Sequence, residues 1–251
     1  MSIPVLILAG SRDGERDPLA LMGNVSHKAL LPIHGKPMID RVVQTLEQVE
    51  DIGPIWVSIE RPDLLSHMKE KVSIFQAAAS PSESVAQALD VIGTPCLVTT
   101  ADHALLRPEW VKEFLQKSQA TYTDLTAGVA LAETIQRDVP HTKRTFIRLA
   151  DMTFSGCNLF WMGSEKSKQV VKLWQRLQQH RKRPLRMALM LGLSTIFRAL
   201  TRSLSSARLE KRIYEITGTQ IKLIPLSDGR AAVDVDKPAD VLLAEQILQH
   251  N

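Results

Sequence analysis

The chain opens with Pro4-Val5-Leu6-Ile7-Leu8-Ala9, an apolar run that stops at Gly10-Ser11-Arg12-Asp13-Gly14 and continues as a polar loop to His27-Lys28. An apolar strand that leads into a glycine-bearing loop is typical of a phosphate site, because glycine lets backbone N–H groups approach phosphate oxygens closely. Arg12 and Lys28 would add the positive charge that backbone groups alone lack. The opening stretch therefore predicts a site for a nucleoside triphosphate.

Bulk composition fits a folded protein of ordinary type. The chain has 251 residues, of which 44% are hydrophobic and 23% charged, close to average globular usage. No basic leader precedes the first apolar run, and Arg12 and Asp13 follow it too soon for a secretory signal. We expect a soluble, cytoplasmic protein in which Cys96 and Cys157 are reduced and packed, with a single disulfide as the alternative.

The first half of the chain alternates between strand and helix patterns. Strand-like runs occupy residues 55–59, 73–76 and 95–100, and helical spacing of apolar residues occupies 38–49, 80–92 and 108–115. Ser80-Pro81-Ser82-Glu83 is a capping box with proline at the first helical position. This alternation predicts a mostly parallel sheet with right-handed crossovers.

The second half is less regular and predicts a mixed sheet. Strand-like runs occur at residues 125–132, 146–149, 158–162, 220–225 and 231–235. Between them, residues 164–217 are basic and read as two or three helices broken by Pro184, and a last helix begins at Pro238. We therefore expect a single domain over residues 1–251 with 164–217 as a basic helical insertion.

Four motifs in this order resemble those of the MobA-like nucleotidyltransferases. They are Leu8-Ala9-Gly10-Ser11-Arg12, His27–Pro32 with Gly35–Met38, Thr100-Ala101-Asp102, and Val233–Asp240. That family includes the molybdenum-cofactor guanylyltransferases and enzymes that activate sugar or cofactor phosphates. The resemblance implies a three-layer α/β/α, Rossmann-like fold of the nucleotide-diphospho-sugar transferase type. It also implies transfer of a nucleoside monophosphate from an NTP to a phosphorylated small molecule, with release of pyrophosphate.

The resemblance also assigns roles to individual residues. Lys28, Arg12 and Asp102 would be catalytic, and Asp102 and Asp234 would hold Mg²⁺, which prefers carboxylate oxygens and keeps several waters. Asn158 would contact the acceptor. The nucleotide would be bound by Leu8, Ala9, Gly10, Ser11, Arg12, Lys28, Ser82 and Ser84.

This sequence departs from the family pattern at several positions, which leaves alternatives open. Ser11 replaces the second glycine of the loop, and the loop to Lys28 is longer, so Arg16 is an alternative to Arg12. His103 follows Asp102 where proline is usual, and we interpret it as structural. Asp102 taken alone also fits a helix cap, and for Asp236 a cap of the last helix is the favoured interpretation.

The function itself has alternatives of other classes. CTP or GTP is favoured as the donor, but the residues identify neither the base nor the acceptor. A glycosyltransferase of similar sheet topology would use a finished NDP-sugar, typically through an Asp-x-Asp pair that Asp102-His103-Ala104 lacks. A non-catalytic nucleotide-binding or membrane-surface module is the remaining alternative.

The net charge of +4 and the pI near 9.1 arise from one segment, since the basic excess collects between Lys166 and Arg212. Trp174 and Phe197 are the only aromatic residues among these cations and no recognised nucleic-acid motif accompanies the charge, so we expect no nucleic-acid binding. An apolar stretch at 185–200 is too short to span a bilayer, which takes about 20 residues. Three interpretations of the basic stretch 181–202 remain: it packs on the sheet or on a second subunit, it lies on the inner face of a membrane, or its cations attract a phosphorylated acceptor. The sequence does not specify an oligomeric state.

Overall fold

The computed structural model describes residues 2–11, 13–140, 142–180 and 190–249. Its strands are β1 (Ile3–Leu8), β2 (Pro32–Ile33), β3 (Lys36–Pro37), β4 (Ile52–Ile59), β5 (Val72–Gln76), β6 (Cys96–Thr100), β7 (Leu125–Leu131), β8 (Ile147–Arg148), β9 (Thr153–Met162) and β10 (Ile221–Pro225). Its α-helices are α1 (Pro18–Met22), α2 (Met38–Glu47), α3 (Pro81–Ile92), α4 (Pro108–Ala120), α5 (Ala132–Asp138), α6 (Ser167–Gln179), α8 (Leu193–Leu200), α9 (Ser206–Thr217) and α10 (Pro238–Gln249).

One eight-stranded sheet forms the centre, in the order β10-β7-β9-β6-β1-β4-β5, and β8 pairs with β9 at its side. The pairs β1–β4, β1–β6, β4–β5 and β7–β10 are parallel, whereas β9 runs antiparallel to both β6 and β7. Parallel neighbours need long connections; α2 lies in the connection from β1 to β4, and α3 lies in the connection from β5 back to β6 beside β1. The prediction of a mixed, mostly parallel sheet is confirmed.

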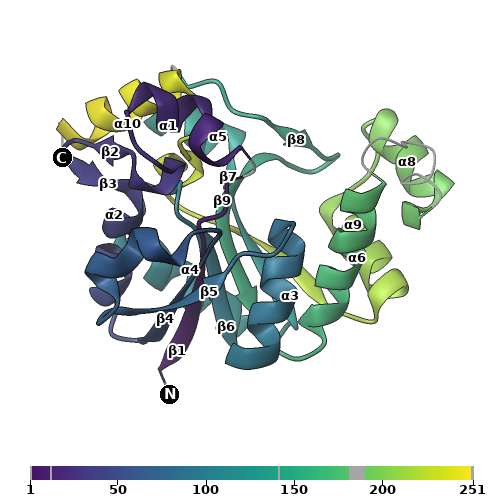
Figure 1. Cartoon of the computed structure of the whole chain (residues 1–251). Coiled ribbons are helices and arrows are strands. Elements are labelled where there is room, and N and C mark those ends of the chain that lie inside the picture. Colours follow the sequence, from purple (N-terminus) through teal and green to yellow (C-terminus); the bar gives the residue numbers. More distant parts are fainter. Residues whose placement is uncertain (1, 12, 141, 181–189, 250–251) are drawn as a thin grey trace.

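Helices cover both faces of this sheet, which gives three layers (Figure 1). Val5 and Ile7 of β1 face a core built with α2, α4 and α10, and Leu6 between them faces a second core built with α3 and α6. All three β1 side chains are fully buried, as expected for a central strand with period-two alternation. The apolar opening run thus forms a central, buried strand of the sheet.

Most predicted elements are present with small shifts of their ends. The capping box is confirmed, because Ser80 Oγ accepts from the Glu83 N–H at 3.3 Å at the start of α3. The helices expected in 164–217 are α6, α8 and α9, while Pro184 lies outside the described residues. Beyond them β10 joins the same sheet beside β7. Cys96 and Cys157 are both buried and free.

The prediction of a strand at residues 231–235 is wrong. Residues Gly229–Ala232 form a 3-10 helix, η4, that begins with the Asp228 carboxylate accepting from the Arg230 N–H at 2.9 Å. Its apolar side chains are buried against α5, β7 and β9. The segment is therefore buried, as its apolar residues indicated, but it does not pair with a strand of the sheet. The backbone of Val235 then turns to Asp102, where its N–H donates to the carbonyl oxygen at 3.0 Å.

Candidate active site at the carboxyl edge of the sheet

A pocket opens where β1 and β6 end, and it is lined by Leu8, Ala9, Gly10, Lys28, Ala29, Met38, Ala101 and Asp102. The chain goes from β1 to β4 and β5 on one side and then to β6 on the other, so these strand ends form a topological switch point. Ligands of open α/β sheets bind at such points. The Ala101 N–H donates to the Leu8 carbonyl at 2.9 Å, which fixes the two strand ends against each other.

Lys28 projects into this pocket from a short 3-10 helix, η2 (Lys28–Leu30). His27 starts that helix, because its Nδ1 accepts from the Ala29 N–H at 3.1 Å. The Lys28 ammonium donates to Asp236 Oδ1 at 2.7 Å and to Asp102 Oδ2 at 3.2 Å. Burial lowers the pKa of Lys28, but the two carboxylates outweigh burial and hold that pKa above its ordinary value. Lys28 is therefore a fixed positive charge.

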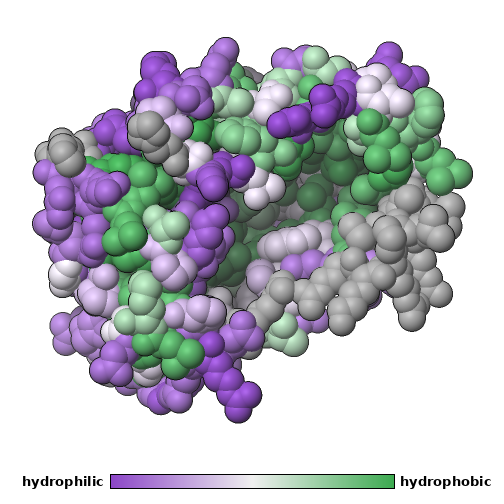
Figure 2. Space-filling view, turned by 90° about the horizontal axis from the view of Figure 1, so that it is seen from above, coloured by the Kyte–Doolittle hydropathy of each residue, from purple (hydrophilic) through white to green (hydrophobic). Residues whose placement is uncertain are grey.

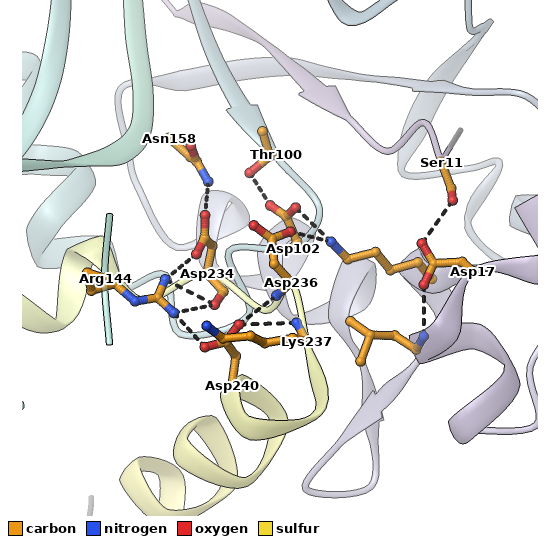
Figure 3. A network of polar contacts seen from close by, with 12 residues as sticks. Ser11, Asp17, Thr100, Asp102, Arg144, Asn158, Asp234, Asp236, Lys237 and Asp240 are labelled. Carbon is orange, nitrogen blue, oxygen red and sulfur yellow. Dashed lines mark hydrogen bonds and ion pairs between the residues drawn. The ribbon is translucent and has the colours of Figure 1, made fainter. Parts of the chain in front are cut away.

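Asp102 follows β6 and is held by both its side chain and its backbone. Thr100 Oγ1 donates to Asp102 Oδ1 at 2.5 Å, and the backbone bond from Val235 brings the segment 234–236 alongside. Figure 3 shows the carboxylates of Asp102, Asp234 and Asp236 gathered at one place. Residues more than a hundred positions apart in the chain thus meet at one edge of the sheet.

Asp234 lies beside Asn158 and Arg144 in the same network (Figure 3). Asn158 Nδ2 donates to Asp234 Oδ2 at 3.1 Å, and Arg144 forms a short ion pair with Oδ1. Asn158 has a φ of +50° on β9, where the register with β7 shifts. Asparagine tolerates this left-handed conformation better than most residues, and such a bulge redirects the side chain.

The acidic cluster is electrostatically crowded. The pKa of Asp234 is raised by its burial first and then by the nearby charges of Asp236 and Asp102, against the opposing effects of Arg144 and Asn158. Carboxylates whose ionisation is disfavoured by each other form a site that favours an added cation. Arg144 partly compensates this negative charge, because it pairs with Asp234.

Arg144 is a residue of this network that sequence reasoning missed. Its side chain is only 6% exposed, and it donates to Asp240 Oδ1 at 2.7 Å as well as to Asp234. Asp240 in turn accepts from the N–H groups of Asp236 and Lys237, both at 3.1 Å. Asp240 therefore caps the start of α10. Arg144 precedes a two-residue strand in an irregular segment, and no periodicity or spacing around it indicates a buried ion pair.

The favoured interpretation of Asp236 as the helix cap is not what the structure shows. Asp240 supplies that cap, and the Asp236 carboxylate contacts Lys28 instead. The sequence does contain the required residues, because Asp240 lies within the last matched motif. The spacing alone could not tell which aspartate turns toward the backbone and which turns toward the pocket.

A second pocket lies on the other side of Leu8 and Gly10. It is lined by Leu8, Gly10, Ser58, Glu60, Ala77, Ala78, Ala79, Ser80, Pro81 and Ser84. A Cβ at Gly10 would stand 3.0 Å from Glu60 Oε1, so glycine allows this close approach. Burial raises the pKa of Glu60, but the hydrogen bond with His27 Nε2 and two backbone bonds outweigh it, so that pKa lies below its usual value. Glu60 is an ionised acceptor at this pocket.

The remaining predicted residues are distributed unevenly around the two pockets. Ser84 lines the second pocket, where its Oγ accepts from the Ala78 N–H at 2.9 Å and orders the loop. Ser82 is fully buried and bonds to Gln178 of α6, so the fold does not bring it to either pocket. Ser11 Oγ donates to Asp17 Oδ2 at 3.2 Å (Figure 3).

Arg12 and Arg16 were the alternatives for an arginine that contacts phosphate. Arg12 lies outside the described residues, and Arg16 is exposed on the short helix η1 (Gly14–Arg16). His103, interpreted as structural, is buried and stacks on Trp110 with ring centroids 6.1 Å apart. Burial lowers the pKa of His103 to about 4, so the ring is neutral near pH 7.

The chain belongs to the MobA-like NTP transferase family, whose domain model matches residues 5–213. It is similar to the structure of a hypothetical transferase from Thermus thermophilus, with 28% identity, a TM-score of 0.81, and coverage of 96% of this chain and 100% of that one. A search of curated proteins gave no significant match. The family makes this protein a nucleotidyltransferase.

More distant solved structures share the fold. A CMP:2-keto-3-deoxy-manno-octonic acid synthetase complexed with CTP has 15% identity and a TM-score of 0.60, with coverage of 99% of this chain and 98% of that one. The 2-C-methyl-D-erythritol 4-phosphate cytidylyltransferase from Thermus thermophilus has 12% identity and a TM-score of 0.58, covering 99% of this chain and 100% of that one. The predicted fold class is confirmed by this likeness and by the sheet.

Proposed function

We propose that this nucleotidyltransferase transfers a nucleoside monophosphate, from CTP or GTP, to a phosphorylated small molecule in a magnesium-dependent reaction. An oxygen of the acceptor phosphate forms a bond to the α-phosphorus, and the bond from the α-phosphorus to the bridging oxygen breaks. Pyrophosphate leaves with that electron pair. The observation that carries the proposal is the meeting of Lys28, Asp102 and Asp234 beside the Gly10 loop.

Positioning and charge supply most of the rate in such a displacement, because both reactants are anions. The Lys28 ammonium faces the pocket and is held in place by Asp102 and Asp236 before any substrate binds. A fixed cation of this kind stabilises charge that develops on phosphate oxygens without further reorganisation. Leu8, Ala9 and Gly10 line the same pocket, and glycine allows a phosphate to approach the backbone closely.

Asp102 and Asp234 fit the requirements for Mg²⁺. The raised pKa of Asp234, caused by burial and then by Asp236 and Asp102, reflects an excess of negative charge that a cation relieves. Within the described ranges no three His, Cys, Asp or Glu side chains are arranged to hold a metal by themselves. Mg²⁺ needs only one or two carboxylates, because waters and substrate phosphates complete its shell. When bound, it would neutralise phosphate charge and assist the departure of pyrophosphate.

The second pocket is the place for the nucleobase, because it adjoins Gly10 and has one ionised acceptor. Glu60 can accept hydrogen bonds from the amino group of cytosine or from the N–H groups of guanine, whereas uracil offers a carbonyl oxygen at the position of the cytosine amino group. The structural relatives named above include a CTP complex and a cytidylyltransferase, which favours CTP. Asn158 and Arg144 flank Asp234, and we assign the acceptor to this side.

Pyrophosphate release tests the proposal. The protein is incubated with each NTP, MgCl₂ and a panel of sugar, polyol and cofactor phosphates. Asp102→Asn and Asp234→Asn should each lower turnover by about 10²–10³-fold, the usual effect of removing one group that stabilises transition-state charge. The matched control is Asp63→Asn, since Asp63 is an exposed carboxylate paired with Arg61. Full activity in both site variants, or silence of the wild type across the panel, contradicts the proposal.

A further inference from the structure

Helix α8 is oriented against the usual rule for a soluble protein. Leu193, Phe197 and Leu200 are 66%, 67% and 78% exposed, and Thr195 on the opposite side is only 8% exposed. The spacing of the three apolar residues places them on one helical face. The least exposed of these positions on the helix is thus polar, and its apolar stripe is exposed. Folding gains nothing from this arrangement, so the exposed face marks a binding surface.

Identifiable contacts hold the segments just before and just after α8. Arg212 of α9 donates to the Leu191 carbonyl at 2.7 Å just before α8. After α8, the Leu204 carbonyl accepts from the Ala150 N–H at 2.8 Å, and Asp151 accepts from both the N–H and the hydroxyl of Ser206. The turn between β8 and β9 therefore anchors the connection between α8 and α9.

The surroundings of the stripe are strongly basic. Within the described segment 190–212 five residues are basic, Arg198, Arg202, Arg208, Lys211 and Arg212, and a single one is acidic, Glu210. Arg198, Arg202, Arg208 and Lys211 are exposed, and the Glu210 carboxylate is engaged with Lys222 at 3.2 Å. An apolar stripe with basic flanks is complementary to a surface that is apolar inside and anionic outside. A second copy of this chain would instead bring like charges together.

The stripe lies on the same side of the molecule as the candidate site. Figure 2 looks onto the carboxyl ends of the parallel strands and shows a hollow there, with apolar surface gathered on the right, where Figure 1 places α8. The turn that anchors the connection between α8 and α9 links β8 to β9, and β9 carries Asn158 beside Asp234. We propose that α8 and the cations around it dock on an anionic lipid bilayer, so that the hollow opens toward the membrane surface.

Vesicle flotation of the full-length protein tests this directly. The wild type is mixed with vesicles of phosphatidylcholine alone or of phosphatidylcholine with phosphatidylglycerol, and the floated fraction is measured. We expect binding to the anionic vesicles only, weakened at about 0.5 M salt because screening then acts within a few ångströms. Equal binding to neutral vesicles, or no binding to either, overturns the proposal without the need for any variant.

Paired variants identify the surface. Phe197→Ser with Leu200→Ser should lower the partition coefficient roughly tenfold or more, because two apolar side chains no longer insert. The matched control, Leu21→Ser with Leu242→Ser, alters side chains of similar exposure, 66% and 63%, on α1 and α10. Arg198→Glu with Arg202→Glu should lower binding comparably, against a control of Lys69→Glu with Lys112→Glu that changes net charge equally. Equal effects of test and control pairs overturn the assignment to α8.

Two further readouts separate this proposal from others. Sedimentation tests the other occupant: a wild-type dimer that Phe197→Ser dissociates, together with no flotation, assigns the stripe to self-association and overturns membrane docking. Calorimetry with CTP and MgCl₂ tests the nucleotide site separately. Nucleotide binding that persists without flotation refutes docking alone, whereas flotation without nucleotide binding refutes the proposed function alone.

Discussion

The site at the carboxyl edge of the sheet and the outer face of α8 follow opposite rules. In the site, Lys28 contacts two carboxylates and the nearly buried Arg144 contacts two more, so polar groups away from water are compensated. On α8, large apolar side chains stand in water around a buried threonine. Contacts within the fold account for the polar groups of the site, whereas the exposed apolar face of α8 calls for a binding partner outside the chain.

The largest expected effect breaks the ion network of the site. Arg144→Ala should lower the free energy of unfolding by about 3–5 kcal/mol, because it leaves Asp234 and Asp240 without their buried cation. Urea denaturation measures the change. The control is Arg137→Ala, which removes an arginine that is 64% exposed and pairs with Asp138; it should leave the free energy of unfolding nearly unchanged, because water screens an exposed pair. Equal losses in the two variants would show that the network of Arg144 is not critical for stability.

The next effect is stabilisation by ligand. CTP with MgCl₂ at a concentration near 100 times its dissociation constant should add about 2.7 kcal/mol, which corresponds to a rise in Tm of roughly 5–10 °C for a chain of this size. Chelation should remove the magnesium-dependent part of the rise. Asp102→Asn should lack that part even before chelation. A shift that is unchanged by chelation would remove the assignment of a metal to Asp102.

A smaller effect concerns the base. Glu60→Gln should narrow the preference for CTP over UTP about tenfold, since hydrogen bonds to a charged group contribute about 1.5–3 kcal/mol and the amide accepts more weakly. The ratio of kcat/KM for the two nucleotides measures this preference. Ser80→Ala is the control at the rim of the same pocket. An unchanged ratio in Glu60→Gln would exclude Glu60 from base selection.

The smallest expected effect is on stability, at the exposed stripe of α8. Phe197→Ser should change the free energy of unfolding by no more than about 0.5 kcal/mol, because the ring is already in water. Phe114→Ala, which removes a fully buried ring of α4, should cost about 3–5 kcal/mol. Thermal or urea unfolding compares the two. A large loss at Phe197 would mean that the stripe packs within the protein.

Much of the fold followed from local patterns. A few neighbouring residues were enough to predict the first strand, the helix after Pro37 and the capping box at Ser80. All three predictions were confirmed. The strand expected at 231–235 was wrong because burial against α5 and β9 produces the same apolar signal as sheet pairing. Period and composition report how deeply a segment is buried and not which neighbour buries it.

Part of the site was predicted from motifs that follow strand-like runs in the sequence. Lys28, Asp102 and Asp234 were identified from motifs, and the fold brings them together, although their catalytic and metal-binding roles stay predictions. Arg144 and the exchange of roles between Asp236 and Asp240 were missed. An ion pair between residues 90 apart in sequence leaves no periodic trace, and only the path of the chain decides it.

By itself, the sequence determined the alternation of strands and helices, the glycine-bearing loop at the end of the first strand, and the basic character of residues 166–212. Such features depend on steric and solvation preferences that act over one or two turns of chain. Tertiary structure alone decided which carboxylate meets Lys28, where the cation of Asp234 comes from, and that α8 turns its apolar stripe outward. These depend on contacts across the sheet, which exist only once distant segments have packed.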